Sequence, residues 1–369
     1  MRLERIAVRH LSLPLAHPFE TSFGRSERKE FLLVEVSAGG VRGYGECVAD
    51  VNPFYLPETN TTVLHVLRDF LAPIALALDV AHPRELGGAF ARVRGHEMAK
   101  AALEMATWEL WARREGLPLY RVLGGRGGRI VSGVSIGLQP DVPTLVAKVE
   151  QEVSAGYRRV KIKIKPGRDL ALVAAVRERF PKLPLMVDAN SAYTPSDTAL
   201  LRELDRYDLM MIEQPLAWDD VADHAALQRE LKTPICLDES IRAPALARQA
   251  LELGAARIIN IKAGRLGGFG PSLEVEALCR GRGAPVWCGG MLESGIGRLA
   301  NVHLQTLAGF SLPGDTAASA RYFAEDLVDP PVIVDPDGTV AVPEGAGIGH
   351  AIVWPRVERA TTFREEWRR

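Results

Sequence analysis

The sequence predicts an α/β fold: a TIM-type barrel of eight parallel strands and seven helices, joined to an α+β domain. Charged residues recur at a near-constant step, because 25 positions separate Lys163 from Asp188, Asp188 from Glu213 and Glu213 from Asp238, and 24 separate Asp238 from Lys262. A step of about 25 residues is typical of one strand, one helix and two short loops. Several of the expected strands are also almost entirely apolar, as in a parallel sheet that is covered on both faces.

Residues 1–125 lack this repeat and are expected to form the α+β domain. Segments 2–13 and 31–37 alternate in polarity like antiparallel strands, and Gly39, Gly40 and Gly43 are expected at turns. The GYGE segment at 43–46 is interpreted as a hairpin turn, since it lacks the third glycine and the following helix of a nucleotide-binding loop. Apolar residues at steps of three and four from Met98 to Ala112 predict a helix.

The repeat begins near residue 130. Strands are expected at 131–137, 160–164, 184–189, 209–213, 235–239, 257–262, 285–288 and, in a shorter form, 311–315. Ala- and Arg-rich segments such as 141–155 and 169–180 are expected to be helices between them. Residues after about 320 are again rich in strand and turn signals, and we expect them to pack on the first domain. We therefore divide the chain into an N-terminal domain at 1–125, a barrel at 126–320 and a C-terminal segment at 321–369.

The composition argues against several kinds of partner. The formal net charge is −1 and no basic stripe interleaved with aromatic residues is present, which argues against nucleic acid. The apolar run at 70–78 is too short to span a membrane, and Arg5, Arg9 and His10 interrupt any signal peptide. The four cysteines are widely spaced without a CxxC motif, which predicts reduced thiols in a cytoplasmic protein. We expect a homo-oligomer that acts on a small molecule.

The repeating charged residues form a coherent chemical set. In a barrel of this kind the carboxyl ends of all strands open on one face, so Asp188, Glu213 and Asp238 are expected to meet there. Three carboxylates with no His or Cys beside them suit one hard divalent cation, Mg²⁺ or Mn²⁺. Such an ion would stabilise the enediolate that forms when a proton α to a substrate carboxylate is removed. Lys163 and Lys262 flank the three acids and are the expected proton carriers.

The use of lysine supports this role. Only nine of the 45 basic residues are Lys, and Arg cannot release a proton near neutral pH, whereas a buried Lys can. Burial and neighbouring cations are expected to lower the lysine pKa toward the range of a base. Lys161 shares the strand parity of Lys163 and is expected one layer deeper. It would either lower the pKa of Lys163 as a like charge or form a structural ion pair.

The segments KIKIKPG, VDANSAYT, MIEQPL, CLDES, NIKAGRLGG and WCGGMLESGIGR, in this order and spacing, resemble the enolase superfamily. They are most similar to its branch of o-succinylbenzoate synthases and N-acylamino acid racemases. The resemblance implies a capping domain, made of the N-terminal part and the C-terminal tail, over a (β/α)7β barrel. It also implies metal ligands at Asp188, Glu213 and Asp238 and acid/base residues at Lys163 and Lys262. The pairing of a lysine base with magnesium is typical of enolase-superfamily sites.

Further residues are expected around this site. Asn190 and Glu239 stand beside the expected ligands, where the resemblance implies that they order the metal site. Other side chains are expected to contact the substrate, some because they follow barrel strands and some because the resemblance implies capping loops that close over it. Those that follow strands are Ser135 and, as walls of an apolar acyl pocket, Met291 and Leu292; those in capping loops are Phe19, Phe23 and Tyr55.

The resemblance implies removal of a proton α to a carboxylate, in an o-succinylbenzoate synthase, an N-acylamino acid racemase preferring N-succinyl substrates, or both. A muconate cycloisomerase would share the lysine pattern. A dipeptide epimerase would carry Asp-x-Asp on the eighth strand, where LPGDTAA has Asp315 alone. A histidine base, as in mandelate racemases, is disfavoured because His303 falls in a predicted helix. Two alternatives of other classes are a metal-binding barrel without catalysis and a phosphate site at GGM, residues 289–291.

Overall fold

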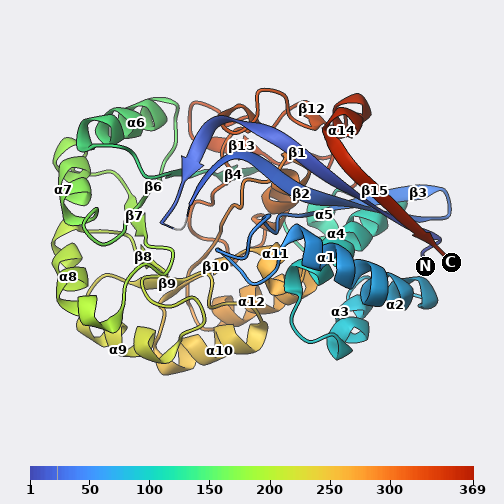
Figure 1. Ribbon diagram of the computed structural model, residues 1–369, viewed down its shortest axis with the longest axis horizontal. Helices are drawn as coiled ribbons and strands as arrows, with labels where there is room; N and C mark the ends of the chain where they lie inside the picture. Colours follow the sequence, from blue (N-terminus) through green and yellow to red (C-terminus); the bar gives the residue numbers. More distant parts are fainter. Residues whose placement is uncertain (23) are drawn as a thin grey trace.

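The computed structural model describes residues 1–22 and 24–369, so the predicted substrate contact of Phe23 lies outside the described residues. Antiparallel strands and helices of the N-terminal part, blue and mostly on the right of Figure 1, lie beside a curled parallel sheet surrounded by helices. The two parts have the architectures that the sequence predicted, α+β for the first and a barrel-like α/β arrangement for the second.

The antiparallel sheet has the strand order β15-β1-β2-β3, and its strands are β1 (Arg5–Glu20), β2 (Arg25–Ala38), β3 (Val41–Cys47) and β15 (Thr361–Arg368). The polarity alternation at 2–13 and 31–37 located β1 and β2 correctly, although both strands extend beyond these segments. β15 comes from the C-terminal segment and pairs with β1, so that Trp367 lies opposite Ile6.

Five helices follow in the chain: α1 (Asn60–Val66), α2 (Ala72–Ala77), α3 (Glu85–Ala89), α4 (Glu97–Arg114) and α5 (Leu119–Leu123). The predicted helix corresponds to α4, but α4 is buried on more than one face. It contacts β2 and β3 on one side, and α11 (Ala263–Leu266) and α12 (Phe269–Gly281) of the barrel on another. α4 is therefore the common support of the antiparallel sheet and the barrel.

The GYGE segment is not a hairpin turn, and that prediction was wrong, as was the turn at Gly43. Both Gly43 and Gly45 lie inside β3, while the turn before it contains Gly39 and Gly40. The reason is close packing: a Cβ at Gly43 would come within 2.3 Å of the Ala106 carbonyl oxygen on α4, and one at Gly45 within 2.2 Å of another carbonyl oxygen on this helix. Glycine is needed here because the strand backbone touches the helix backbone.

The parallel sheet has the order β11-β10-β9-β8-β7-β6-β5, which is the order of the strands along the chain. Each strand is followed by a helix, and the observed bounds lie within a few residues of the predicted ones. The strands are β5 (Val134–Ile136), β6 (Val160–Lys163), β7 (Leu185–Asp188), β8 (Ile212–Glu213), β9 (Ile235–Leu237), β10 (Ile258–Ile261) and β11 (Val286–Cys288). Besides α11 and α12, the helices are α6 (Val142–Ser154), α7 (Leu170–Arg179), α8 (Thr198–Glu203), α9 (Ala222–Glu230), α10 (Pro244–Leu253) and α13 (Gly295–Leu304).

The predicted eighth strand at 311–315 is not a regular strand, but this segment hydrogen-bonds to both ends of the parallel sheet. On one side the backbone N–H of Asp315 donates to the Cys288 carbonyl at 2.8 Å. On the other side the N–H of Gly133 donates to the Gly314 carbonyl at 2.7 Å. Pro313 has no N–H to donate, which interrupts a continuous ladder. The segment connects β11 to the chain just before β5.

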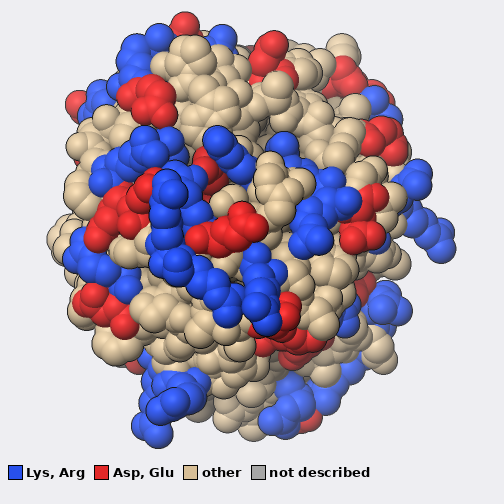
Figure 2. Space-filling view, turned by 90° about the vertical axis from the view of Figure 1, so that its right-hand side faces the viewer, with Lys and Arg blue, Asp and Glu red and all other residues tan. Residues whose placement is uncertain are grey.

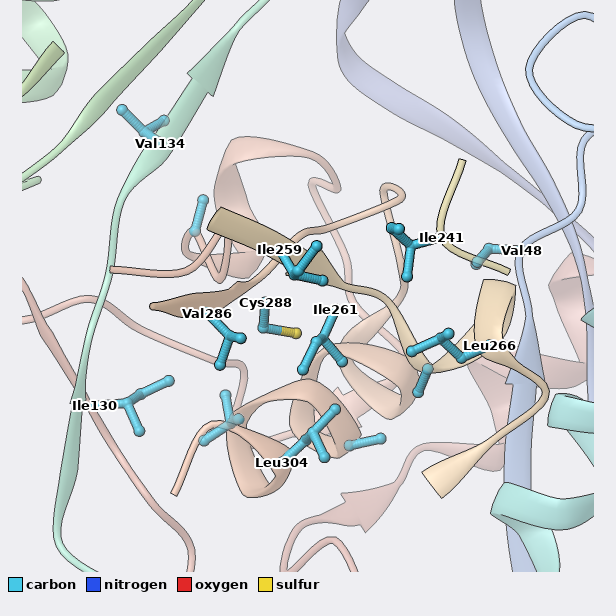
Figure 3. Close-up of a cluster of buried hydrophobic side chains, with 14 of the residues drawn as sticks. Val48, Ile130, Val134, Ile241, Ile259, Ile261, Leu266, Val286, Cys288 and Leu304 are labelled. Atoms are coloured by element: carbon cyan, nitrogen blue, oxygen red, sulfur yellow. The ribbon is translucent and has the colours of Figure 1, made fainter. Parts of the chain in front are cut away.

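Side chains alternate between the inside of the barrel and the helix layer. Figure 3 shows Ile259 and Ile261 of β10 in one buried cluster with Cys288 of β11 and Leu304 of α13. Because successive strand residues face opposite sides, the residues between and after these two isoleucines point into the barrel. A separate inner cluster of Met186, Met211, Cys236, Ile258 and Trp287 fills the barrel interior. The inward positions closer to the carboxyl ends of the strands are polar.

The remaining elements are two short antiparallel pairs and one helix. β4 (Arg129–Val131) pairs with β13 (Thr339–Ala341), β12 (Val328–Asp329) pairs with β14 (Ala351–Ile352), and α14 (Trp354–Ala360) precedes β15. The exact division of the chain at 125 and 320 stays a prediction. Among the described residues no helix has the length and apolar character required to cross a membrane. Figure 2 shows basic and acidic side chains interspersed on the face near β3 and β15.

We expect Gly45→Ala to lower the free energy of unfolding by at least about 1–3 kcal/mol, since the added methyl group overlaps the backbone of α4. Urea denaturation monitored by circular dichroism measures this change. Gly87→Ala in α3 is the matched control, because a Cβ there has no neighbour within 4 Å. The control should be neutral or stabilise by up to about 1 kcal/mol. Equal stabilities for the two variants would contradict the close approach of β3 and α4.

Candidate active site

Six charged side chains meet at the carboxyl ends of the parallel strands. Lys163 of β6 pairs in register with Asp188 of β7, and Asp188 pairs with Glu213 of β8, so successive strands place these residues side by side. Asp238 and Lys262 directly follow β9 and β10. The exposed fractions of the six residues lie between 0 and 7%. The set consists of Lys161, Lys163, Asp188, Glu213, Asp238 and Lys262; all but Lys161 belong to the 25-residue repeat.

Lys163 is bound to the end of the neighbouring strand. Its Nζ donates hydrogen bonds to Asp188 Oδ2 at 2.6 Å and to Asn190 Oδ1 at 2.5 Å. The amide nitrogen of Asn190 in turn donates to Glu239 Oε1 at 2.9 Å. The structure thus brings the two predicted supporting residues, Asn190 and Glu239, into one chain of hydrogen bonds with Lys163.

Lys262 occupies a similar position on the other side of the acids. Its Nζ donates to Asp238 Oδ2 and to the Tyr55 hydroxyl, both at 2.7 Å. The Tyr55 hydroxyl donates to the same carboxylate oxygen at 2.9 Å. The second oxygen of Asp238 accepts a hydrogen bond from Arg265, which also donates to the carbonyl oxygen of Asn260. Asp238 is therefore held by three side chains, one of them from the N-terminal domain.

Lys161 lies at the centre of a deeper layer. Its Nζ lies 2.9 Å from Glu213 Oε2, 2.8 Å from Asp315 Oδ2 and 3.4 Å from Asp188 Oδ2. Arg159 binds the other oxygen of Asp315 at 2.6 Å. Of the two interpretations of Lys161, the geometry favours the structural ion pair, since three carboxylates surround this ammonium group.

The pKa values reflect this crowding of charge. Burial and repulsion by Asp188 raise the pKa of Glu213 to about 8. Burial disfavours the ionised form of Asp238 as well, but the charges of Arg265 and Lys262 outweigh it and lower the pKa of Asp238. The pKa of Lys262 is raised, because the attraction of Asp238 outweighs the effect of burial. The raised pKa of Lys262 is opposite to the lowering that the sequence led us to expect, because the neighbouring acids stabilise its charged form.

The donor set of the three acids fits a hard divalent cation. Asp188, Glu213 and Asp238 offer only carboxylate oxygens, and Asp188 lies close enough to Glu213 to add to the effect of burial in raising the pKa of Glu213. With the side chains as they stand, no three histidine, cysteine or acidic residues within 1–22 and 24–369 are grouped to hold a metal ion. The present partners of these carboxylates are lysine and arginine nitrogens, which a cation would have to replace.

A cavity of about 890 Å³, counted with its open mouth, is lined by four of the six charged residues, Lys161, Lys163, Asp188 and Lys262. The predicted substrate contacts that the structure describes all line it: Phe19 and Tyr55 from the N-terminal domain, and Ser135, Met291 and Leu292 from the barrel. Sequence reasoning missed further lining residues, among them Lys29, Glu58, Met98 and Tyr322. Nothing in their local sequence marks them, since they reach the cavity only through the docking of the two domains.

Other residues of the site could have been found from strand parity. Asn260 lies two positions before Lys262 and faces the same side of β10, where it donates to Glu213 Oε1 at 2.8 Å. Backbone strain also marks the site. Asn190, Gln214 and Leu292 have positive φ angles of 43°, 37° and 59°, and each lies close to a strand end that carries site residues. Non-glycine residues in this region often cluster at functional sites.

Two alternative sites do not have the geometry that their functions require. His303 lies in α13, where its Nδ1 accepts a hydrogen bond from the Tyr120 N–H at 3.2 Å and burial lowers its pKa to about 4. It is absent from the cavity lining, so a structural role accounts for it. In the GGM segment the N–H groups of Gly289 and Met291 already donate to Asn260 and Glu293, which leaves them unavailable to a phosphate.

The chain is similar to known proteins over its whole length. Residues 5–124 match the mandelate racemase/muconate lactonizing enzyme N-terminal domain, and residues 144–356 match the enolase C-terminal domain-like family. An o-succinylbenzoate synthase from Geobacillus stearothermophilus is 52% identical, covering 100% of this chain and 98% of that protein. An N-succinylamino acid racemase from Thermus thermophilus is 48% identical, covering 98% of this chain and 98% of that protein.

The crystal structure of an enolase-superfamily member from Listeria innocua has a TM-score of 0.96 at 43% identity, covering 100% of this chain and 99% of that one. The predicted resemblance and fold class are confirmed.

We expect Asp315→Asn to destabilise the protein by about 3–5 kcal/mol, because it leaves the buried guanidinium of Arg159 without a carboxylate. The free energy of unfolding in urea measures this loss. Glu230→Gln is the control, since Glu230 pairs with Arg202 on the surface, where an ion pair contributes about 0–1 kcal/mol. A change below about 1 kcal/mol in Asp315→Asn would show that the buried pair is not needed for stability.

Proposed function

Because the chain belongs to the enolase superfamily, in the family of o-succinylbenzoate synthases and N-succinylamino acid racemases, we propose that it removes a proton α to a carboxylate. We propose both activities of these relatives for it: dehydration to o-succinylbenzoate and racemisation of N-succinylamino acids. Both begin with the same proton removal and share an enediolate intermediate, so one site can support them.

The observation that carries this proposal is the placement of two lysines on either side of the acids. Lys163 is at the end of β6 and Lys262 follows β10, while the three strands between them carry Asp188, Glu213 and Asp238. Both lysines line the cavity, and each is oriented by an acid at the end of the adjacent strand. A substrate in the cavity would have one ammonium group on each side of its α-carbon.

We propose that Asp188, Glu213 and Asp238 hold one divalent cation, Mg²⁺ or Mn²⁺, in line with the metal dependence of enolase-superfamily enzymes. When bound, the cation supplies positive charge for the developing enediolate and neutralises carboxylate charge that otherwise raises the pKa of Lys262. Glu239 and Asn190 would orient Lys163 through their hydrogen bonds. Lys161 would keep Glu213 and Asp188 together through its contacts with both.

In racemisation the Nζ of one lysine accepts the α-proton, and the Nζ of the other donates a proton to the opposite face. In the synthase reaction we propose that Lys163 accepts the proton and that Lys262 remains a cation next to the enediolate while water leaves. The Tyr55 hydroxyl restricts Lys262 by sharing Asp238 Oδ2 with it. General acid–base catalysis of this kind contributes about 10²–10⁴-fold to the rate.

The cavity favours an N-acyl group over the free amino group of a dipeptide. Asp315, the single acid of the LPGD segment, is engaged by Arg159 and Lys161 and so is not free to bind an ammonium ion. Met291, Leu292 and Phe19 contribute apolar walls to the cavity, which suit an acyl chain. Ser135 lines the same cavity, and its hydroxyl has no hydrogen-bond partner among the described residues, so it is available to the substrate.

We further propose that the enzyme acts in the cytoplasm as a homo-oligomer. The cytoplasmic location is supported by four buried cysteines that form no disulfide. Assembly is supported by large apolar side chains on the surface of the N-terminal domain, such as Phe70, which is 49% exposed.

Removal of metal is expected to abolish both activities, and Mg²⁺ or Mn²⁺ should restore them. Asp238→Asn should weaken binding of Mn²⁺ strongly, because one of three anionic ligands is lost. Titration of Mn²⁺ followed by electron paramagnetic resonance measures this without turnover. Asp141→Asn, at the start of α6, is the control and should bind Mn²⁺ like the parent. Full activity after rigorous chelation would overturn the metal proposal.

The two-base proposal predicts that each lysine variant loses proton exchange with a different enantiomer of the substrate. Lys163→Ala and Lys262→Ala should each slow racemisation of N-succinylamino acids by at least about 10²-fold, since each removes one partner of a two-sided transfer. In D₂O each variant should still exchange the α-proton of one enantiomer, and the two variants should retain opposite enantiomers. Lys232→Ala, an exposed lysine, is the control. Racemisation near the parent rate in either variant would remove that lysine from the mechanism.

A further inference from the structure

We propose that Glu58 is a positioning residue that fixes the loop of residues 50–59 to α4 and thereby holds Tyr55 against Lys262 and Asp238. We call this segment the Tyr55 loop. The effect of Glu58 on catalysis rests on the proposed function, whereas the anchoring of the loop does not depend on it.

The Tyr55 loop leaves the N-terminal sheet after β3 and returns at α1 with its ends joined. Asp50 and Thr59 form a bridge, and the N–H of Asn60 donates to the Asp50 carbonyl at 2.9 Å. Lys29 supports the start of the loop, because its Nζ donates to the Val48 carbonyl at 3.2 Å. The chain between these ends must therefore project from the sheet as a closed loop.

Two neighbouring aromatic side chains at the tip of the loop, Tyr55 and Phe54, have different surroundings. Tyr55 points into the site, where its hydroxyl lies 2.7 Å from Lys262 Nζ and 2.9 Å from Asp238 Oδ2. Its neighbour Phe54 is 66% exposed, so it contributes little to holding the tip in place. Leu56, next to Tyr55, is buried in the hydrophobic cluster of the N-terminal domain, and this packing holds one side of the tip. A hydrogen-bonded anchor adds direction to this apolar contact.

Glu58 supplies this anchor at the amino end of α4. Its Oε1 accepts a hydrogen bond from the Met98 N–H at 2.8 Å, and its Oε2 accepts one from the Ala99 N–H at 3.1 Å. These N–H groups belong to the first turn of α4, where the helix itself leaves them without partners. The residue before the helix, His96, has a φ of 57° and makes no side-chain cap. Glu58 therefore takes the place of a local cap; burial raises the pKa of its carboxyl group to about 7, and the two N–H groups of the helix offset part of this effect.

α4 is a fixed support because another carboxylate binds it to the barrel. Glu104 of α4 accepts hydrogen bonds from the N–H groups of Phe269 and Gly270, at 2.7 and 2.8 Å, at the start of α12. α12 has no side-chain cap of its own. Two acids thus connect the barrel to α4 and α4 to the Tyr55 loop. Through α4, the Tyr55 loop is therefore held in a fixed position relative to the barrel that carries Lys262.

The consequence for the reaction is that Glu58 acts through Tyr55. Loss of the anchor lets the tip leave the site, and Lys262 then loses one of its two hydrogen-bond partners that the structure shows at Nζ. Glu58→Ala should reduce kcat/KM for N-succinylamino acids by at least about tenfold, as expected for hydrogen bonds to a charged acceptor. Glu58→Gln keeps one acceptor oxygen and should show a smaller loss, which also covers the case that Glu58→Ala folds poorly.

A double-mutant cycle tests whether the effect passes through Tyr55. In the parent enzyme Tyr55→Phe removes the hydroxyl that contacts Lys262. If Glu58 acts through this hydroxyl, Tyr55→Phe should change kcat/KM much less in the Glu58→Gln or Glu58→Ala background than in the parent. Additive losses in both backgrounds would show that Glu58 acts by another route and would overturn the proposal. Asp141→Ala, which removes an ordinary helix cap from α6, is the matched control and should leave kcat/KM unchanged.

A second measurement follows the loop without turnover. The four native cysteines are buried, so Phe54→Cys offers one accessible thiol for a nitroxide label. The label should become more mobile in Glu58→Ala than in the parent or in Asp141→Ala. Unchanged mobility in Glu58→Ala would overturn the anchoring. If mobility rises but the parent does not act on N-succinylamino acids, the proposed function fails and the anchoring stands.

Discussion

Three carboxylates can be buried side by side only if positive charge lies among them, and this requirement organises the whole carboxyl end of the barrel. Asp188, Glu213 and Asp238 face one another, and lysine nitrogens contact all three. Burial and the charge of Asp188 raise the pKa of Glu213 to about 8 even though Lys161 contacts it, which shows how much the buried acids depend on positive charge. Stability and chemistry therefore depend on the same charges. Two of the three lysines that balance the acids, Lys163 and Lys262, are also those for which we propose proton transfer.

The N-terminal domain takes part in this balance and does not merely cover it. Tyr55 contributes a hydroxyl to Asp238, and Glu46 accepts hydrogen bonds from the N–H groups of Ser294 and Gly297 at the start of α13. Glu104 does the same at α12. Burial raises the pKa of both glutamates to about 7, which is the physical cost of placing them between the domains. Backbone N–H groups at helix starts offset part of that cost.

The sequence was sufficient for features with a local or periodic signal. The 25-residue step located Lys163, Asp188, Glu213, Asp238 and Lys262, because each marks the end of one strand–helix unit. Features that arise from packing between distant segments were not predictable in this way. The GYGE glycines signalled a turn by composition, but their reason is contact with α4, which no local pattern shows.

The same distinction applies within the site. Asn260 could have been predicted from the sequence, since it lies two positions before Lys262 and faces the same side of the strand. Arg265 and Glu58 could not have been predicted in this way, because their partners lie in other elements. Arg265 binds the acid after β9, and Glu58 binds the first turn of α4. The eighth strand predicted at 311–315 is not a regular strand, because Pro313 and irregular pairing prevent a regular ladder, although the segment lies between the two ends of the sheet.

The pairing of β15 with β1 has a consequence for the order in which the chain can fold. β1 and β2 leave the ribosome before the barrel strands, but the edge of β1 finds its partner only after residues 361–368 have been made. By then the strands from β5 to β11 have been synthesised, and their neighbours in the sheet are also neighbours along the chain. Contacts between remote segments form more slowly than local ones. The barrel can therefore assemble during translation, whereas the N-terminal sheet keeps an open edge at β1 until β15 has been made.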